Sequence, residues 1–271
     1  MDLKNVFFDK VGRPIDYHQY ALDNNIYDLI GFDDEYVSDK HNYDYAVDEN
    51  YDQQLPVQIE DLIRIHFLIR KFKVITALEF GSGKSTIVIA DALMCNRNEY
   101  KDFVSKNLRK NNKFELHTVE TSDIWAKKTS LQIPEKLKLI VNFSVTDVNM
   151  SVVNSKICTL YDDLPNITPD FIYLDGPDQY APLNSINGIS TSHPDRLPMV
   201  ADLVRIEYFL LPGTLILVDG RTSNSMFMLN NFQQDWSYKH YEDQDISIFY
   251  NNSKPLGNYN KAELKFKFSQ E

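Results

Sequence analysis

Hydrophobic positions in the first half of the chain change from a helical spacing to a strand-like spacing and back again. Aliphatic residues between positions 59 and 68 recur at helical spacing with charged residues between them, and lysines close the segment, which predicts a helix. The next segment, 74–79, is short and rich in β-branched residues and predicts a buried strand. A glycine-containing turn, 80–86, follows, and helical character resumes over 87–94. A glycine motif is informative only in this context, directly after a strand and before a helix.

Three later segments also have the pattern of buried strands, and each of them ends in an acidic residue. They cover residues 114–120, 169–175 and 215–219. With the first strand included, the terminal acids are Glu79, Glu120, Asp175 and Asp219. In a doubly wound sheet the carboxyl ends of parallel strands lie on one edge. The sequence therefore predicts that four carboxylates converge around a single crevice.

The remaining periodic segments complete an α/β pattern. Their expected bounds are 100–110, 199–211 and 224–236 for helices, and 238–241 and 246–250 for two short strands. Short final strands of this kind commonly form the antiparallel edge of an otherwise parallel sheet. The predicted fold class is α/β, with a doubly wound, mostly parallel sheet, helices on both faces and an antiparallel edge strand.

The net charge of −11 is unevenly distributed. Residues 1–62 contain 15 acidic and 4 basic residues, and the remainder carries equal numbers of both signs. A protein that grips a nucleic-acid backbone normally has a basic patch, so nucleic acid is not an expected partner. No apolar run approaches the roughly 20 residues that span a bilayer, and the first residues lack the pattern of a secretory signal. We therefore expect a cytoplasmic protein with no membrane partner; its oligomeric state stays open.

The acidic N-terminal segment is expected to form a unit of its own. Residues 1–55 hold seven of the sixteen tyrosines, too many aromatic residues for a typical disordered tail, so we expect a cap that folds onto the body. A boundary near Leu55 and Pro56 leaves residues 56–271 as the main α/β domain. The two cysteines, Cys95 and Cys158, lie among apolar residues and are assigned no chemistry.

Two cofactor-binding interpretations compete for the glycine turn. Gly83, Lys84 and Ser85 match the last three positions of a phosphate-binding P-loop, but the first glycine of that motif falls on Leu78, inside the strand. The other interpretation is an acidic residue followed by Gly-x-Gly, a pattern that begins at Glu79. Glycines at these positions let the backbone pass close to a cofactor without a side chain in the way.

Four runs, LEFGSGKST, HTVE, IYLDGP and LPGTLILVDGR, together resemble the class I S-adenosylmethionine-dependent methyltransferases over residues 70–250. The resemblance implies a Rossmann-like fold, S-adenosylmethionine as cofactor and a small molecule as methyl acceptor. Glu120 would accept hydrogen bonds from the ribose hydroxyls, and Ser85 stands where the family often has a third glycine. The predicted cofactor-binding residues are Glu79, Phe80, Gly81, Ser82, Gly83, Ser85, Glu120 and Asp175.

Two of the terminal acids also match ligand positions of metal-dependent O-methyltransferases. Asp175 and Asp219 occupy those positions, but Gly220 stands where that branch usually has asparagine. The lysine that this branch places near the reacting oxygen is missing after Asp175. These departures argue against a bound divalent metal, and no metal ligand is predicted.

Methyl transfer by in-line displacement depends mainly on positioning, with proton removal from an alcohol or amine as the further requirement. The predicted catalytic residues are Asp175, His193 and Asp219. His193 belongs to a polar loop, 178–196, that could cover the crevice. Two alternatives remain: a non-catalytic or altered S-adenosylmethionine-binding protein of the same fold, and a P-loop phosphotransferase.

Overall fold

The computed structural model describes residues 3–9, 11–31 and 58–269. The helices are α1 (Tyr17–Asp23), α2 (Ile26–Ile30), α3 (Ile59–Lys71), α4 (Lys84–Asn107), α5 (Asp123–Gln132), α6 (Glu135–Lys138), α7 (Asp202–Arg205), α8 (Thr222–Leu229) and α9 (Gly257–Phe268). The strands are β1 (Thr76–Phe80), β2 (Glu115–Glu120), β3 (Val141–Val145), β4 (Val148–Val153), β5 (Lys156–Tyr161), β6 (Phe171–Leu174), β7 (Leu215–Asp219), β8 (Trp236–Tyr241) and β9 (Ile246–Asn251). Short 3₁₀ turns lie at Leu3–Asn5, Glu207–Phe209 and Glu242–Gln244.

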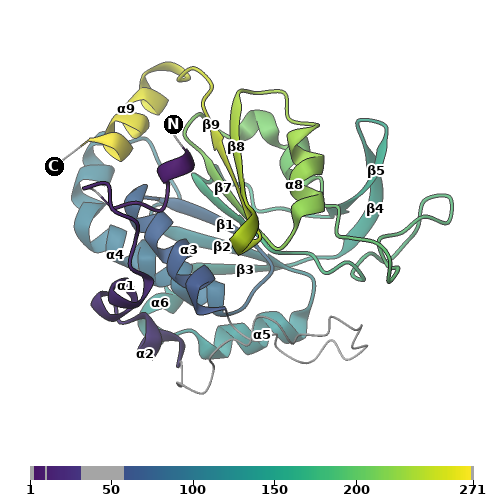
Figure 1. The fold of residues 1–271 in the computed structure, drawn as a ribbon, viewed down its shortest axis with the longest axis horizontal. Helices are drawn as coiled ribbons and strands as arrows, with labels where there is room; N and C mark the ends of the chain where they lie inside the picture. The colour runs from purple at the N-terminus through teal and green to yellow at the C-terminus, as the bar shows by residue number, and fades with distance from the viewer. Residues whose placement is uncertain (1–2, 10, 32–57, 270–271) are drawn as a thin grey trace.

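Seven strands form one sheet in the order β3-β2-β1-β6-β7-β9-β8 (Figure 1). The first five are parallel, and β9 runs antiparallel to both β7 and β8. The chain proceeds outward from β1 to β3 and then returns to place β6 on the other side of β1. The strand order therefore reverses between β1 and β6, the position where ligands bind in open α/β sheets. The predicted fold class is confirmed.

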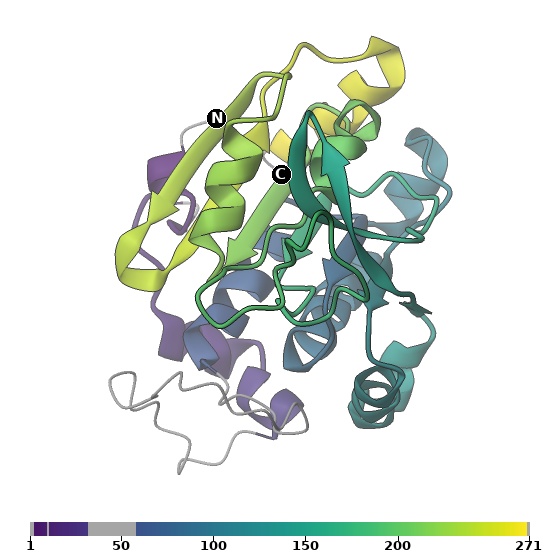
Figure 2. The ribbon, with the colours of Figure 1, turned by 90° about the vertical axis from the view of Figure 1, so that its right-hand side faces the viewer.

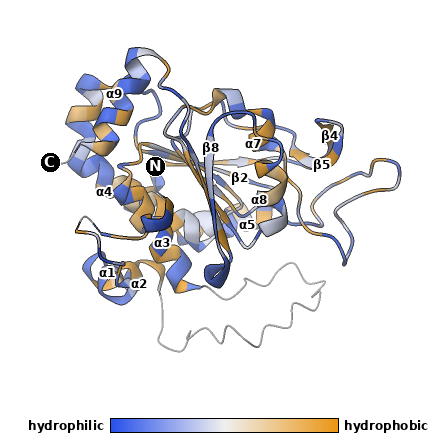
Figure 3. Ribbon diagram, turned by 45° about the horizontal axis from the view of Figure 1, so that its top comes forward, coloured by the Kyte–Doolittle hydropathy of each residue, from blue (hydrophilic) through white to orange (hydrophobic). Residues whose placement is uncertain are grey.

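Both faces of the sheet are covered by apolar side chains. On one face, α3 and α4 supply aliphatic residues that pack against strand residues such as Ala77 and Tyr173. On the other face, the β4–β5 hairpin, α7 and α8 pack against strand residues such as Leu78 and Ile172. Figure 2 shows the hairpin and α8 in front of the sheet. In Figure 3 the inner strands are mainly orange, whereas the edge strand β8 is paler and bluer.

The helix α4 corrects the expectation of two separate helices over 87–94 and 100–110. It runs unbroken from Lys84 to Asn107. The polar stretch 95–99 interrupts the apolar pattern, but the helix contains neither glycine nor proline, and nothing in the backbone ends it. In its second half Val104 is buried, whereas its neighbour Phe103 is exposed.

Two other predicted helices are shorter in the structure than the hydrophobic pattern suggested. In place of a helix over 199–211, the chain has α7, one turn of α-helix, followed by a 3₁₀ turn. Val200 instead forms a parallel bridge to Thr159 of β5, which holds the start of the segment in an extended conformation. The helix expected over 224–236 is α8, which ends at Leu229, and the two short strands after it are confirmed as β8 and β9.

The described part of the N-terminal segment packs on α3 and α4. The Lys71 ammonium donates to the carbonyls of Val6 and Phe8 at 2.7 and 2.9 Å. The Tyr20 hydroxyl lies 2.8 Å from Nδ1 of His66 on α3. Four of the seven tyrosines in the predicted cap and its expected boundary at Leu55 and Pro56 lie outside the described residues. The described ranges contain no helix that is long and apolar enough to cross a membrane.

Candidate cofactor and substrate site

The four acids that end the parallel strands lie at one edge of the sheet and project from the same face. We call this set, Glu79, Glu120, Asp175 and Asp219, the acid edge. Glu79 is in register with Thr118 and Tyr173, and Tyr173 is in register with Leu217. The other three acids each lie two residues beyond these partners, and side chains two apart on a strand share a face. The register therefore brings the four acids to one edge and one face of the sheet, whereas the crevice around them stays a prediction.

The turn after β1 packs directly against the end of β6. Gly81 has a positive φ of 94°, a conformation that favours glycine. A Cβ atom at Gly176 would come within 2.6 Å of the Gly81 nitrogen and 2.8 Å of the Phe80 carbonyl carbon. Gly83 differs, because a Cβ atom there would meet no described atom within 4 Å. The turn therefore leaves open space beside Gly83, at the N-terminus of α4.

Glu79 is fully buried and surrounded by hydroxyl donors. Ser85 Oγ, Thr86 Oγ1 and Thr118 Oγ1 donate to its carboxylate at 2.6, 2.7 and 2.9 Å. Burial raises the pKa of Glu79 to about 7 although these hydrogen bonds oppose the rise. In this arrangement Glu79 fixes the glycine turn and the first turn of α4 from beneath.

Glu120 is held in a different way, with one carboxylate oxygen anchored by the backbone. Oε1 accepts the amide N–H groups of Thr121 and Ser122 at 2.8 and 3.0 Å. Oε2 accepts a hydrogen bond from the hydroxyl of Ser82, in the glycine turn, at 2.8 Å. A carboxylate has about four acceptor positions, so Oε2 keeps capacity for a further donor. Glu120 is thus fixed beside the turn by contacts that leave acceptor capacity at its second oxygen.

Asp175 follows β6 and faces an arginine. The Arg221 side chain donates to the Asp175 carbonyl at 2.5 Å, and its Nε lies 3.7 Å from Oδ1 of Asp175. The carboxylate is 56% exposed, whereas the arginine is largely buried. A guanidinium in this position competes with a cation for the carboxylate. The surroundings of Asp175 therefore do not fit a divalent metal.

Asp219, at the end of β7, accepts a 2.6 Å hydrogen bond from the Tyr173 hydroxyl on Oδ2. Burial raises the pKa of Asp219 to about 7, and the neighbouring charges of Asp61 and Asp175 act in the same direction. Asp61 comes from the first turn of α3, where it pairs with Arg64. Asp219 can therefore exchange a proton near neutral pH.

The P-loop interpretation disagrees with the side-chain positions after Gly83. Lys84, which would contact a phosphate, donates instead to the carbonyl of Ile30 at 2.7 Å. Ser85, which would contact magnesium, donates to Glu79. Both side chains that a P-loop uses are therefore engaged away from the turn.

The hydrogen bonds that His193 makes within the described residues involve none of the four acids of the acid edge. Its Nδ1 accepts the N–H of Asp195 at 3.1 Å, and its side chain is 51% exposed. The surrounding loop attaches to β4, where Leu183 donates to Val148 and Thr191 contacts Met150. Within the described residues its hydrogen bonds are local to the loop, and its catalytic role stays a prediction.

Sequence reasoning missed several residues that shape this edge. The Tyr173 hydroxyl bonds to Asp219, and Arg221 bonds to the carbonyl of Asp175 and faces its carboxylate. Tyr161 reaches the same place from β5, where its buried hydroxyl has no hydrogen-bond partner among the described residues. The period-2 alternation could have placed Tyr173 on the face of Asp175, but no local signal indicates Tyr161.

Comparisons with known proteins found similar chains among the solved structures. The seven-stranded order with antiparallel β9 is consistent with the Rossmann-like methyltransferase fold that the resemblance implied. No family model matches the chain, and no curated protein matches it. The assignment of the fold thus stands on the strand order and register of the chain itself.

Three solved structures illustrate the match. An O-methyltransferase of tomaymycin synthesis from Streptomyces achromogenes, in complex with SAM, is 14% identical, with 73% of this chain and 82% of that chain covered and a TM-score of 0.41. An SAH-bound methyltransferase from Podospora anserina is 12% identical, with 73% and 80% covered and a TM-score of 0.43. An O-methyltransferase from Bacillus cereus with SAH is 14% identical, with 89% and 92% covered and a TM-score of 0.40.

Proposed function

We propose that the chain is an S-adenosylmethionine-dependent methyltransferase that acts on a small molecule. The observation that carries the proposal is the placement of Glu120 beside the open space at Gly83, on the edge where the strand order reverses. A carboxylate that is fixed by the backbone can accept hydrogen bonds from ribose hydroxyls, and the neighbouring glycine turn leaves room for the amino-acid chain of the same ligand. The complexes with SAM or SAH among the similar structures agree with this choice.

Each predicted cofactor-binding residue has its own proposed role. Glu120 accepts hydrogen bonds from the ribose hydroxyls at Oε2. Each hydrogen bond to a charged acceptor contributes roughly 1.5–3 kcal/mol to the binding free energy. Gly81 and Gly83 let the amino-acid part of the cofactor pass close to the backbone, with Phe80 and Ser82 in the same turn. Glu79 and Ser85 act as positioning residues because their side chains bond to one another. Asp175, opposite Gly81, closes the other side of the cofactor site.

The bound cofactor supplies an electrophilic methyl group. The protein then has to orient the acceptor and take up its proton. Asp219 suits this role because its pKa lies at about 7 and its Oδ2 is already oriented by Tyr173. Asp175 and His193 are retained as further proposed catalytic residues, of which Asp175 lies on the same edge. Metal chemistry is not part of the proposal because Arg221 occupies the position next to Asp175.

Calorimetry with S-adenosylmethionine, S-adenosylhomocysteine and ATP tests the cofactor. We expect binding of the first two and none of ATP. Glu120→Gln should weaken S-adenosylhomocysteine binding by roughly 10- to 100-fold, because the charge that strengthens the hydrogen bonds is lost. Glu115→Gln is the matched control, at the opposite end of the same strand. Equal losses in the two variants, or ATP binding instead, would contradict the proposed site.

Transfer of a labelled methyl group to a small-molecule extract tests the activity. We expect label in the small-molecule fraction, and Asp219→Asn should lower the rate by roughly 10²- to 10⁴-fold if the acceptor needs a general base. Cofactor affinity should be unchanged in that variant. Cofactor binding without any transfer would instead favour the non-catalytic alternative.

A further inference from the structure

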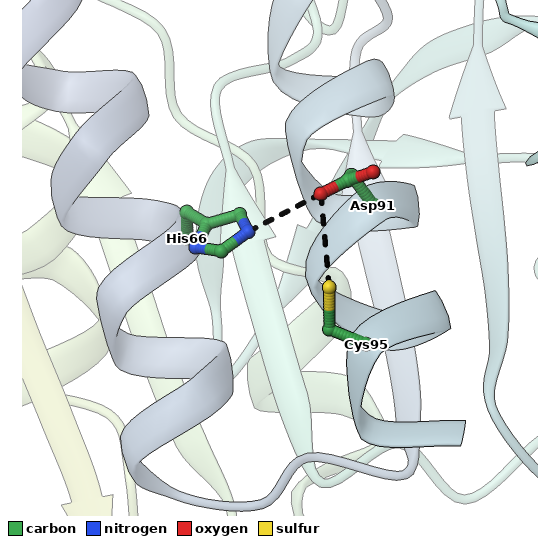
Figure 4. A group of neighbouring side chains, drawn as sticks. All are labelled: His66, Asp91 and Cys95. Atoms are coloured by element: carbon green, nitrogen blue, oxygen red, sulfur yellow. Dashed lines mark hydrogen bonds and ion pairs between the residues drawn. The ribbon is translucent and has the colours of Figure 1, made fainter. Parts of the chain in front are cut away.

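Three side chains with metal-binding atoms meet between α3 and α4, away from the acid edge (Figure 4). His66 comes from α3, and Asp91 and Cys95 come from α4. Their ligand atoms all lie within 4.8 Å of one another. Asp91 and Cys95 are four residues apart, so they share one face of the helix. The packing of α3 on α4 brings the histidine to that face.

Two distances within this group are close to the edges of a metal coordination tetrahedron. His66 Nε2 lies 3.5 Å from Asp91 Oδ2, and Cys95 Sγ lies 3.9 Å from the same oxygen. Zinc bonds to nitrogen and oxygen are about 2.0–2.2 Å long and those to sulfur about 2.3 Å, which gives edges of roughly 3.3–3.6 Å in a tetrahedron. The third separation, between His66 Nε2 and Cys95 Sγ, is no more than 4.8 Å, so all three atoms lie close enough for a small rearrangement of side chains to bring them onto one ion.

The surroundings of His66 distinguish this group from an ordinary cluster of polar side chains. The side chain is 0% exposed, and its Nε2 has no hydrogen-bond partner among the described residues, although it faces the Asp91 carboxylate. A buried polar nitrogen without a hydrogen bond is unfavourable because it has lost its contacts with water. A metal ion bound at Nε2 would supply the missing partner.

The other ring nitrogen of His66 is already oriented. The hydroxyl of Tyr20, on α1, lies 2.8 Å from Nδ1. Metal-binding histidines almost always have an oxygen partner at the second nitrogen, which fixes the tautomer and the direction of the ring. Tyr20 meets this requirement and leaves Nε2 as the atom that faces Asp91 and Cys95.

The carboxylate of Asp91 divides its two oxygens between different neighbours. Oδ1 lies 3.8 Å from the ammonium of Lys136, which is mostly exposed. Oδ2 faces His66 and Cys95. The lysine therefore steadies the carboxylate from outside without filling the position between the three ligand atoms.

We propose that His66 Nε2, Asp91 Oδ2 and Cys95 Sγ bind a transition-metal ion, with Zn²⁺ as the preferred ion. Imidazole, thiolate and carboxylate ligands together suit this borderline-soft cation rather than Mg²⁺ or Ca²⁺. Binding releases the thiol proton of Cys95 to solvent, forms the metal–sulfur bond and involves no change of oxidation state. Water completes the fourth position. The ion joins α3 to α4 and, through Tyr20, to α1.

Cobalt titration of the whole chain tests the site. Co²⁺ alone is added to the metal-free protein, and we expect one equivalent to give a thiolate-to-cobalt charge-transfer band and the strong visible bands of four-coordinate cobalt. Zn²⁺ should displace the cobalt, whereas Mg²⁺ should not. Absence of the charge-transfer band, or its persistence in Cys95→Ser, would overturn the proposal.

Matched variants separate the ligands from general effects on folding. Loss of a residue that only orients a ligand costs about 10- to 100-fold in affinity, so Cys95→Ser and His66→Gln should each lose at least roughly 100-fold in Zn²⁺ affinity. Tyr20→Phe should lose roughly tenfold. Cys158→Ser, at the other cysteine, which bonds to the Ser151 carbonyl, should leave the cobalt spectrum unchanged. Circular dichroism of each variant confirms that the chain is folded. A folded His66→Gln protein that binds Zn²⁺ like the parent would contradict the assignment.

Discussion

Two glycines at the acid edge occupy positions with different constraints. Gly176 is enclosed by backbone, because a Cβ atom there would overlap with the turn after β1. Gly83 has a φ of 170°, an extended conformation that any residue adopts, and its Cβ position is open. The fold itself requires glycine at position 176 and does not require it at position 83. The proposed position of the cofactor over the turn would give a reason for the second glycine.

Alanine at these two positions should therefore separate folding from binding. Gly83→Ala is expected to unfold at nearly the parental denaturant concentration but to bind S-adenosylhomocysteine roughly 10- to 100-fold more weakly, because a methyl group placed in occupied space costs about 1–3 kcal/mol. Gly176→Ala is expected to lose about 3 kcal/mol or more of stability, since backbone atoms block the added group. Urea unfolding and calorimetry measure both effects. Parental affinity in a folded Gly83→Ala protein would speak against a cofactor at the turn.

The buried carboxyl of Glu79 should make stability depend on pH. Its pKa is raised from 4.5 to about 7 by burial, so the folded state holds a proton that the unfolded state has lost. The free energy of unfolding therefore falls as the pH rises from about 4.5 to about 7, by about 1.4 kcal/mol for each unit between the two pKa values. Glu79→Gln, which mimics the neutral form, should flatten this part of the profile.

Thermal unfolding of both proteins from pH 5 to pH 8 measures the difference. Asp202 contributes in the same direction, since burial raises its pKa to about 7, so the variant should keep part of the slope. Parallel profiles in the parent and in Glu79→Gln would show that Glu79 is ionised throughout this range.

At the scale of elements, a buried ion pair attaches the last helix to the start of the sheet. Lys267 on α9 lies 3.1 Å from Asp170, which also accepts the N–H groups of Ile75 and Thr76. Burial alone would raise the pKa of Asp170, but Lys267 and the other donors outweigh it and lower the pKa. The pair thus connects α9, β1 and β6 at the edge opposite the acids.

Removal of one partner should be costly because it leaves the other charge buried alone. Lys267→Met is expected to lower the free energy of unfolding by about 3–5 kcal/mol. Lys265→Met, an exposed lysine on the same helix, should change it by less than about 0.5 kcal/mol. Equilibrium unfolding in urea distinguishes the two. Similar small effects in both variants would mean that solvent reaches Asp170 easily.

The elements differ in how much of them the sequence could predict. Four of the five parallel strands were predicted, because buried strands are short apolar runs with clear ends. The fifth, β3, was missed, since its residues are partly exposed and its apolar pattern is weaker. The length of α4 was not predicted, because a helix continues through polar residues when nothing interrupts its backbone. One of these polar residues, Asn96, is buried and bonds to the carbonyls of Ile69 and Val74. The β4–β5 hairpin was also missed. Its strands are partly exposed and contain asparagine, serine and lysine, which weakens the alternation.

At the scale of the molecule, the candidate site follows from topology more than from any single motif. The acids at the strand ends could be predicted because parallel strands have a common edge, a rule that needs no contact information. The residues that bond to these acids could not be predicted. Arg221 reaches Asp175 from the loop after β7, and Tyr173 reaches Asp219 from the neighbouring strand β6. The same limit applies to Cys95. It was assigned no chemistry because the helix packing that brings His66 beside it is absent from the local sequence.

The helix α4 carries parts of both proposed sites, which raises the question of whether they are coupled. Its N-terminus lies at the glycine turn, and Asp91 lies seven residues further along, about 10 Å at 1.5 Å per residue. Groups more than 7–10 Å apart without common partners usually contribute independently, and we expect S-adenosylhomocysteine to bind with the same affinity, within about twofold, with and without saturating Zn²⁺. Because coupling is reciprocal, the Zn²⁺ affinity should be equally unaffected by the cofactor. Calorimetric titrations in both orders measure this. A change of tenfold or more in either order would show that the metal shifts α4 and thereby the turn at Gly83.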